Sequence, residues 1–358
     1  MSITTTTRIA VALSALLAIA TASIVGAEDT EKALLAKART IFKALPETAH
    51  VDDYPHSQAR VDLGKALFFE TRVSTDGRMS CAACHNPSYY GADSLALSVG
   101  LNGKKLPRNA PTVFNTPLLI AQHYGGNRVS VEEQALKALL SPLAYGNTSY
   151  AEAEAKMRAL GYEKHFSAAF PNEANPVSAE NWATAIGAFE RTLLTPAPFD
   201  SYLKGDSKAI SKEAKLGMEK FINMGCAGCH NGATVGGLSF QKFGITEDYW
   251  LATGSKEMEL LKGRDKGKYH DTKKDEDTYI FKVPQLRNVA MTPPYFHDGS
   301  VAKLDDAVRV MARLQLGQKI SDADVALIVA FLETLTGSVP AQFASAPALP
   351  VAGFQNQN

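Results

Sequence analysis

The sequence predicts a mainly helical protein made of two similar halves with long irregular loops. Two copies of one short pattern, C-x-x-C-H at residues 81–85 and 226–230, contain all four cysteines of the chain. Apolar residues recur at helical spacing before and after each copy, and no stretch shows a convincing strand pattern. Because the order of helix, cysteine motif, long loop and helices occurs twice, the sequence indicates an internal duplication.

In the first half, the helix over residues 31–45 has apolar residues at helical spacing and stops before Pro46, which cannot continue it. A second helix leads into the first cysteine motif. Residues 86–111 are rich in Gly, Ser, Asn and Pro and predict an irregular loop. The later helices of this half again follow the apolar spacing. The ranges after the first helix are 59–69, 131–140, 151–160 and 178–194.

In the second half, a helix again leads into the cysteine motif, and the polar residues 231–274 predict a loop. Two amphipathic helices follow it. The second of these carries Asp322 and Asp324 in its first turn, where the helix dipole favours anions. The three predicted helices cover residues 212–224, 304–314 and 321–335.

The C-x-x-C-H pattern is typical of covalent haem attachment. Two thiols at i and i+3 can form thioether links to one porphyrin, and the adjoining imidazole can reach the iron. The sequence therefore predicts two haem c groups. Their attachment residues and proximal iron ligands are Cys81, Cys84 and His85 in the first half, and Cys226, Cys229 and His230 in the second.

Zinc sites and disulfides are the other uses of such cysteine pairs. A zinc ribbon normally places its two pairs close together in the sequence, whereas here they lie in different halves of the chain. Neither a structural disulfide nor a thioredoxin-like redox pair requires a histidine directly after the second cysteine. Haem attachment uses every residue of the pattern, and so we favour it.

Residues 1–27 have the pattern of a secretory signal peptide. Arg8 supplies a small positive region, residues 9–22 are apolar, and residues 25–27 offer small side chains for cleavage. A membrane anchor is the alternative, because the apolar stretch 9–27 approaches spanning length. Since bacterial haem c is attached outside the cytoplasm, we expect a protein exported to the periplasm.

The composition suits a packed protein without a strong net charge. Lys plus Arg equals Asp plus Glu at 37 each, and 45% of the residues are apolar. No net field favours nucleic acid, so we expect no nucleic-acid partner. The length favours two domains, residues 28–190 and 191–338, each with one motif. The tail, 339–358, is rich in proline and is expected to be unstructured or laid along the surface.

Longer blocks of the sequence resemble the bacterial di-haem cytochrome c peroxidases, a superfamily that also contains the methylamine-utilisation di-haem maturase. These blocks are LGKALFFETRVSTDGRMSCAACHNP, PRNAPTVFN, VEEQAL, AFERTLLTPAPFDSYLKGD, GCAGCHNGATVGG, FKVPQLRNVAMTPPYFHDGSV and RVMARLQLG. They extend over nearly the whole chain after residue 27, and the last two are highly specific. The resemblance implies two class I cytochrome c-like domains: an N-terminal one with a peroxidatic-type haem and a C-terminal one with an electron-transfer haem.

The resemblance also implies an activity and partners. A member of this superfamily would reduce hydrogen peroxide to water with electrons from a small cytochrome c or a cupredoxin. The electrons would enter at the second haem and pass to the first. Members are often homodimers, so we expect a homodimer here.

The resemblance implies that Met311 is the distal ligand of the second haem. Met311 follows His297 by fourteen residues and shares an apolar helical face with Leu304 and Val308. A thioether ligand would raise the reduction potential of that haem and suit it to electron entry. The other candidate methionines are Met218, Met224 and Met291.

The resemblance further implies a calcium ion between the two domains. Its ligands would be the side chain of Asn109 and the carbonyl groups of Thr292 and Pro294, and neutral oxygens of this kind suit a hard cation. The alternative is that Asn109 caps a turn and that residues 292–294 form only a rigid corner.

The chain departs from the superfamily around the first haem. The usual distal histidine falls on Leu101, which cannot bind iron, so we expect this haem to be open, water-bound or capped by another loop residue. The catalytic glutamate falls on Ala144, the bridging tryptophan on Tyr124 and a packed proline on Ala138. Gln134 is the polar residue that remains, so Gln134 and Tyr124 are the candidate catalytic residues. A missing acid–base group costs about 10²- to 10⁴-fold in rate.

Four residues near the lost groups are candidate substitutes for them. His123 is either a catalytic or distal residue or an ordinary structural histidine. Tyr145 lies beside Ala144, whereas Glu132 and Glu133 fit better on the solvated face or first turn of the helix 131–140. His297 is expected to be structural. The losses leave two alternative functions open: an oxidoreductase acting on a protein or organic substrate, and an electron carrier or sensor without enzymatic activity.

Overall fold

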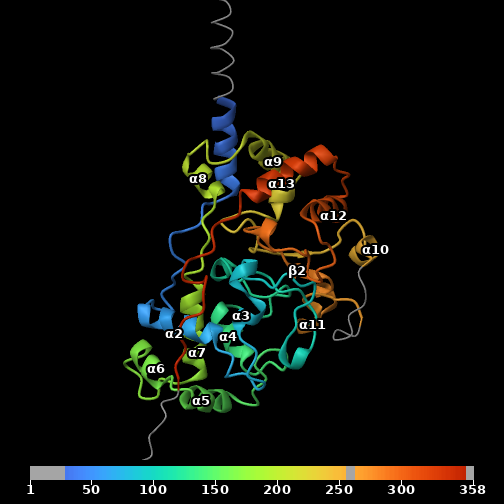
Figure 1. Cartoon of the computed structure of the whole chain (residues 1–358). Helices are drawn as coiled ribbons and strands as arrows, with labels where there is room; N and C mark the ends of the chain where they lie inside the picture. Colours follow the sequence, from blue (N-terminus) through green and yellow to red (C-terminus); the bar gives the residue numbers. More distant parts are fainter. Residues whose placement is uncertain (1–28, 255–262, 352–358) are drawn as a thin grey trace, which may run out of the picture.

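The computed structural model describes residues 29–254 and 263–351. The predicted signal peptide lies outside these residues. The described chain is mainly helical, and its long loops gather between two groups of helices (Figure 1). No helix within the described ranges is long and apolar enough to cross a membrane.

Every helix predicted in the first half is present, with ends that differ by a few residues. Several begin at a serine whose side chain accepts a hydrogen bond from an amide of the first turn, as Ser130 and Ser178 do. The helices are residues 29–41, α2 (Gln58–Phe69), α3 (Cys81–Cys84), α4 (Val131–Ala138), α5 (Tyr150–Ala159), α6 (Glu163–Ala169) and α7 (Ala179–Glu190).

In the second half, helices again lie before and after the cysteine motif. Its helices are α8 (Pro198–Lys204), α9 (Lys212–Asn223), α10 (Tyr249–Thr253), α11 (Tyr269–Thr272), α12 (Leu304–Leu316) and α13 (Asp322–Glu333). The sequence analysis missed α6 and α8. In α8 the signal was present, because Pro198 occupies the first turn and Gly205 ends the helix in the left-handed conformation.

Two short strands correct the expectation that the chain has no strand. β1 (Phe240–Lys242) and β2 (Ile280–Lys282) pair antiparallel, with Gln241 opposite Phe281. Together with α10 and α11 they also show that residues 231–274 are more than a loop. Three-residue strands are too short to produce a detectable alternation in the sequence.

The helix before each cysteine motif crosses another helix at a glycine. On α2, a Cβ at Gly64 would lie 1.8 Å from the carbonyl oxygen of Ala185 on α7. On α9, a Cβ at Gly217 would lie 1.8 Å from the carbonyl oxygen of Leu327 on α13. Only glycine permits this approach. Both glycines belong to the same L-G-x-x-x-F pattern, which supports the duplication.

The two ends of the chain pack against the opposite halves (Figure 1). Ala38 and Phe42, from the N-terminal segment, lie in the core formed by α9 and α13. Phe343, from the C-terminal segment, is fully buried in the core formed by α2 and α7, where its ring centroid lies 5.6 Å from that of Phe68. The first part of the predicted tail is therefore a packed element, which corrects the expectation of an unstructured or surface segment.

Candidate haem-binding site

The first C-x-x-C-H motif forms one helical turn, α3. Its thiols at i and i+3 lie on the same side of the turn, and all four cysteines of the chain are free. The Sγ atom of Cys81 lies 3.6 Å from the hydroxyl of Tyr145. The Nδ1 atom of His85 lies 3.0 Å from the carbonyl oxygen of Gly91. This contact orients the ring and leaves Nε2 for a metal ion.

The second motif begins on a short turn, Cys226–Gly228, and ends at a buried histidine. Burial lowers the pKa of His230 to about 4, so its ring is neutral at pH 7, the form that binds iron. Its Nδ1 atom faces Gly236, where a Cβ would come within 3.0 Å. The ring therefore needs a glycine beside it.

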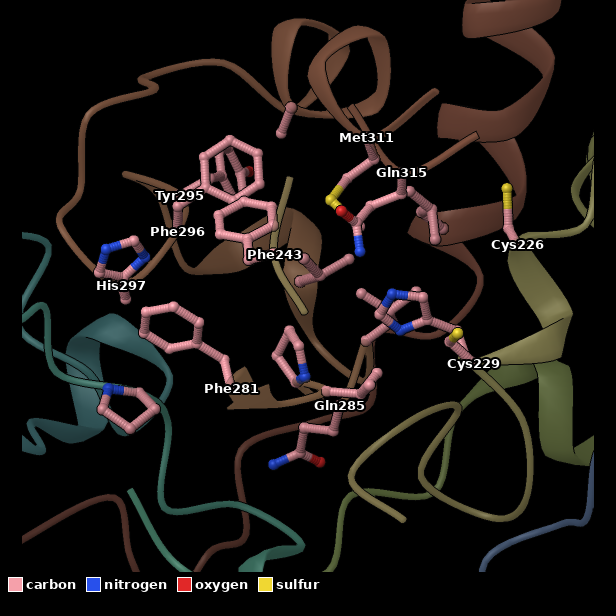
Figure 2. Close-up of a pocket in the computed structure, with 18 of the residues that line it drawn as sticks. Cys226, Cys229, Phe243, Phe281, Gln285, Tyr295, Phe296, His297, Met311 and Gln315 are labelled. Carbon is pink, nitrogen blue, oxygen red and sulfur yellow. The ribbon is translucent and has the colours of Figure 1, made fainter. Parts of the chain in front are cut away.

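A cavity of about 270 Å³ lies next to the second motif. The lining includes Cys226, Cys229, His230 and Met311. Figure 2 shows the Met311 thioether and the Gln315 amide pointing into the cavity from α12, with Gln285 on its other side. Most of the remaining lining is apolar or aromatic. Two thiols, a neutral imidazole and a thioether in an apolar cavity fit a covalently held haem.

The other candidate methionines fit a distal ligand less well. Met218 is fully buried in the core of α9 and α13, and Met291 is 42% exposed. Met224 lines the cavity, but it lies only two residues before Cys226 of the cysteine motif. A ligand for the opposite face of the haem has to come from another element, and Met311 on α12 does so.

Leu101 is packed inside the first half of the chain. It is buried, and its N–H donates to the carbonyl oxygen of Leu143 at 3.0 Å. Its side chain lies over Gly146, where a Cβ would come within 2.4 Å of Leu101 Cδ2. Ala144 belongs to the same contacted segment, and Tyr145 N–H donates to the carbonyl oxygen of Ala138 at 3.3 Å. Leu101, Ala138 and Ala144, three of the positions that depart from the superfamily, therefore lie on neighbouring segments.

The two predicted catalytic residues lie apart. Gln134 is partly buried on α4, and its side-chain amide makes no hydrogen bond to any residue of the described ranges. Tyr124 lines the cavity, and burial raises the pKa of its hydroxyl well above the ordinary value. The Tyr124 hydroxyl donates to Asn109 Oδ1 at 3.3 Å. A tyrosine held neutral in this way can donate a hydrogen bond but does not act as a base at pH 7.

The three residues predicted to bind calcium border the same cavity. Asn109 comes from the first half, and Thr292 and Pro294 come from the second. The Asn109 amide nitrogen donates to Leu95 O at 2.7 Å, which turns Oδ1 toward Tyr124. The three residues therefore border one cavity, and the calcium site stays a prediction.

His123 also lines the cavity and has a defined orientation. Its Nδ1 atom lies 2.8 Å from Asn127 Oδ1, and the Asn127 amide donates to Asp271 Oδ1 at 2.8 Å. Its φ of 64° is unusual for a residue other than glycine. Burial lowers the pKa of His123 to about 4. These contacts leave Nε2 as the nitrogen that can serve a ligand.

His297 lies at the centre of a buried aromatic cluster, 4.6 Å from the ring centroid of Phe281 and 5.3 Å from that of Tyr249. Its Nε2 atom is 3.9 Å from Asp265 Oδ2. Arg108, from the first half, binds Asp265 with two hydrogen bonds of 2.6 and 2.8 Å. Although burial acts to raise the pKa of Asp265, Arg108 holds it below its usual value. The ion pair between Arg108 and Asp265 joins the two halves. It lies beside His297, whose ring is packed among aromatic side chains.

A buried acidic pair lies in the first half, and it corrects the expectation for Glu132. Glu132 is in the first turn of α4, as expected, but it is only 4% exposed and is bound by Arg191 at 2.8 Å. Glu190 on α7 is also buried, and burial together with the charge of Glu132 raises its pKa to about 8. The sequence gives no sign of this pair because α4 and α7 meet only in the folded chain.

Comparisons with known proteins give relatives over most of the chain. Residues 58–208 match the family model described as di-haem cytochrome c peroxidase. The chain is 40% identical over 310 residues to the cytochrome c551 peroxidase of Pseudomonas aeruginosa, covering 86% of this chain and 88% of that protein. It is 33% identical over 319 residues to the methylamine utilization protein MauG of Methylorubrum extorquens, covering 86% of each chain.

A solved structure shows the same fold. It is described as a MauG-like protein associated with microbial copper homeostasis, with a TM-score of 0.73 and 26% identity, and the match covers 85% of this chain and 97% of that one. Fold and site together define a c-type di-haem oxidoreductase. The chain belongs to the di-haem cytochrome c peroxidase family.

Proposed function

We propose that this chain is a periplasmic peroxidase that reduces hydrogen peroxide to water with electrons from a small cytochrome c or a cupredoxin. The first haem would be held by Cys81, Cys84 and His85, and the second by Cys226, Cys229 and His230. Each half would be a class I cytochrome c-type domain. Bound haem would supply one-electron redox chemistry and, where one face is open, a site for a peroxide.

One observation carries the proposal: the two candidate haem sites have unequal distal sides. Met311 enters the cavity that contains His230. In the first half, Leu101 is held against the segment around Leu143 and offers no ligating atom. A thioether suits electron entry, whereas an open face suits a small oxidant. The unequal sides therefore favour separate electron-transfer and peroxidatic haems.

Proton transfer is the demanding part of this reaction for the chain, because Ala144 provides no carboxylate. His123 is a titratable side chain that lines the cavity, and its ring is held by Asn127, whose amide in turn donates to Asp271. Gln134 and Tyr124 are the proposed catalytic residues, each as a hydrogen-bonding group, and His123, whose pKa burial lowers to about 4, is the alternative distal residue. Tyr124 would link the two halves, because its hydroxyl donates to the carbonyl oxygen of Phe296 at 3.5 Å and its own carbonyl oxygen accepts from Lys282 N–H at 2.8 Å.

The proposal also includes a bound calcium ion. Asn109, Thr292 and Pro294 line one cavity, and neutral oxygens such as theirs suit a hard cation completed by water. Metal analysis of the purified protein should give one calcium per chain. A homodimer is also proposed, and sedimentation of the haem-loaded protein tests it.

Turnover measurements test the function. Purified haem-loaded protein should oxidise a reduced small cytochrome c or cupredoxin in the presence of hydrogen peroxide. Met311→Ala should slow this turnover and lower the reduction potential of one haem by on the order of 100 mV, leaving the other nearly unchanged. Met224→Ala is the matched control. Absence of turnover with every donor, in protein whose first haem still reacts with peroxide, would favour a protein or organic substrate instead.

The second candidate is an oxidoreductase acting on a protein or organic substrate. This function is favoured by the absence of the family's glutamate and histidine, whose positions hold Ala144 and Leu101. Oxidation of a protein or organic substrate need not depend on the proton transfer to peroxide that the glutamate provides. An electron carrier or sensor would be equally unaffected by these losses. A ferric protein that does not react with peroxide at all would select the carrier.

A further inference from the structure

Lys282, the last residue of β2, is a buried lysine without a counter-ion. Only 7% of its surface is exposed. Its backbone N–H donates to the carbonyl oxygen of Tyr124 at 2.8 Å, which fixes the strand. Within the described ranges, its ammonium group has no hydrogen-bond or ion-pair partner. Burying an ammonium without an anion is strongly unfavourable, so the fold leaves this charge for a group that is added later.

Lys282 lines the cavity beside the second cysteine motif. No Asp or Glu of the described residues lines this cavity. The other permanent cation in the lining, Arg287, is already bound by Asp200 through hydrogen bonds of 2.6 and 2.8 Å. Burial alone lowers the pKa of Lys282 to about 8, and no acidic side chain opposes this shift. The cavity therefore has an excess positive charge at Lys282.

We propose that Lys282 binds a propionate carboxylate of the haem held in this cavity. A porphyrin with two carboxylates supplies the anion that the cavity lacks, and a charge-assisted hydrogen bond would compensate for the desolvation of the ammonium. Phe281 and Gln285, which lie close to Lys282 in the sequence, are on the wall of the cavity in Figure 2. The inference rests on the proposed function, because it requires a haem on Cys226 and Cys229.

The contact would set the reduction potential of the second haem. A fixed positive charge beside a haem propionate favours the ferrous form, which carries one positive charge less than the ferric form. In a buried site this effect is screened only weakly by solvent and salt. Lys282 would therefore raise the potential of the haem at which electrons enter.

Redox titration of the haem-loaded protein at one fixed pH tests the proposal. Lys282→Gln should lower the midpoint potential of the second haem. The expected change in its reduction equilibrium is about tenfold, which corresponds to about 59 mV for one electron. The first haem should shift less. Lys282→Arg, which keeps the charge, should stay close to the unmodified protein. Lys242→Gln removes an exposed lysine from the paired strand β1 and should change neither potential.

The outcomes separate this inference from the proposed function. Unchanged potentials in folded Lys282→Gln with both haems attached would overturn the inference alone, whereas a chain without covalent haem would overturn the proposed function. If Lys282→Gln does not fold, a crystal structure of the unmodified haem-loaded protein decides. An Nζ atom about 2.7–2.9 Å from a propionate oxygen supports the inference, and an Nζ atom bound only to protein or solvent contradicts it.

Discussion

At the scale of single residues, the site depends on how each side chain is buried. The histidines of both motifs have pKa values lowered by burial and are neutral, ready to bind metal. Leu101, by contrast, packs against Gly146 and offers no ligating atom at the position where the resemblance implies a ligand. This contrast makes Leu101 the residue through which the state of the first haem can be changed.

Replacement of Leu101 by histidine should slow the reaction of the fully oxidised protein with peroxide by about tenfold or more. The reason is that an imidazole bound to the first haem has to leave before peroxide can bind. Stopped-flow absorbance with one equivalent of peroxide measures the rate. Leu101→Ala, which removes packing but adds no ligand, is the matched control. Equal rates for Leu101→His and Leu101→Ala would show that residue 101 does not reach the haem.

Glu190 predicts how stability depends on pH. Burial, and secondly the charge of Glu132, raises its folded pKa to about 8 from an ordinary value of 4.5, so the folded state holds a proton that the unfolded state releases. Its stabilising contribution is therefore present below about pH 4.5 and is lost as the pH rises to 8, with a slope of at most about 1.4 kcal/mol per pH unit.

Urea unfolding between pH 5 and 8 checks this sign. Glu190→Gln, which keeps the shape and has no proton to lose, should flatten the decline in the free energy of unfolding over that range. Glu213→Gln, at an exposed position, should leave the slope unchanged. An unaltered slope in Glu190→Gln would assign the pH dependence to other groups.

Residue-level prediction was possible where a few neighbouring residues carry the chemistry. The four cysteines and two histidines follow from a five-residue pattern, and Met311 follows from resemblance. Glu132 and Lys282 could not be recognised in the same way. Their burial depends on α7 and on the pairing of β2, which are distant in the sequence.

At the scale of the elements, the close helix crossings position both cysteine motifs. Gly64 and Gly217 allow the helix before each motif to touch the carbonyl groups of its partner helix. Helical periodicity predicted these helices but not the crossings, because periodicity reports which face is apolar and not how near two backbones come. The first helix ends at residue 41, before the expected residue 45. Its end is also set by a backbone contact between distant segments, because Phe42 forms a β-bridge with Gly232.

Gly217→Ala should destabilise the second half by about 1–3 kcal/mol. The added methyl group meets the backbone of Leu327, which cannot move aside without shifting α13. Denaturant unfolding measures the change. Gly228→Ala is the control, because a Cβ there meets nothing within 4 Å and the first motif already has Ala83 at this place. Equal stability of the two variants would contradict the tight crossing.

At the scale of the whole molecule, the exchanged ends hold the two halves together. The N-terminal helix packs with α9 and α13, and Phe343 packs with α2 and α7. Because each terminal segment lies on the half that is distant from it in the sequence, division of the chain by sequence order did not show this arrangement. A long proline-rich tail also carries no periodic signal from which burial could be inferred.

Phe343→Ala should lower the free energy of unfolding by about 3–5 kcal/mol, since it empties a site among packed rings. Thermal and urea unfolding give the value. Val351→Ala changes an exposed residue of the same segment and is the control. If Phe343→Ala were as stable as the control, the tail would not be part of the core.

The spectrum and peroxide reactivity of the fully oxidised, haem-loaded protein test the central claim most directly. The account predicts a high-spin first haem alongside a low-spin second haem, and rapid reaction with one equivalent of hydrogen peroxide without prior reduction. Two low-spin haems, with no reaction until one of them is reduced, would contradict it.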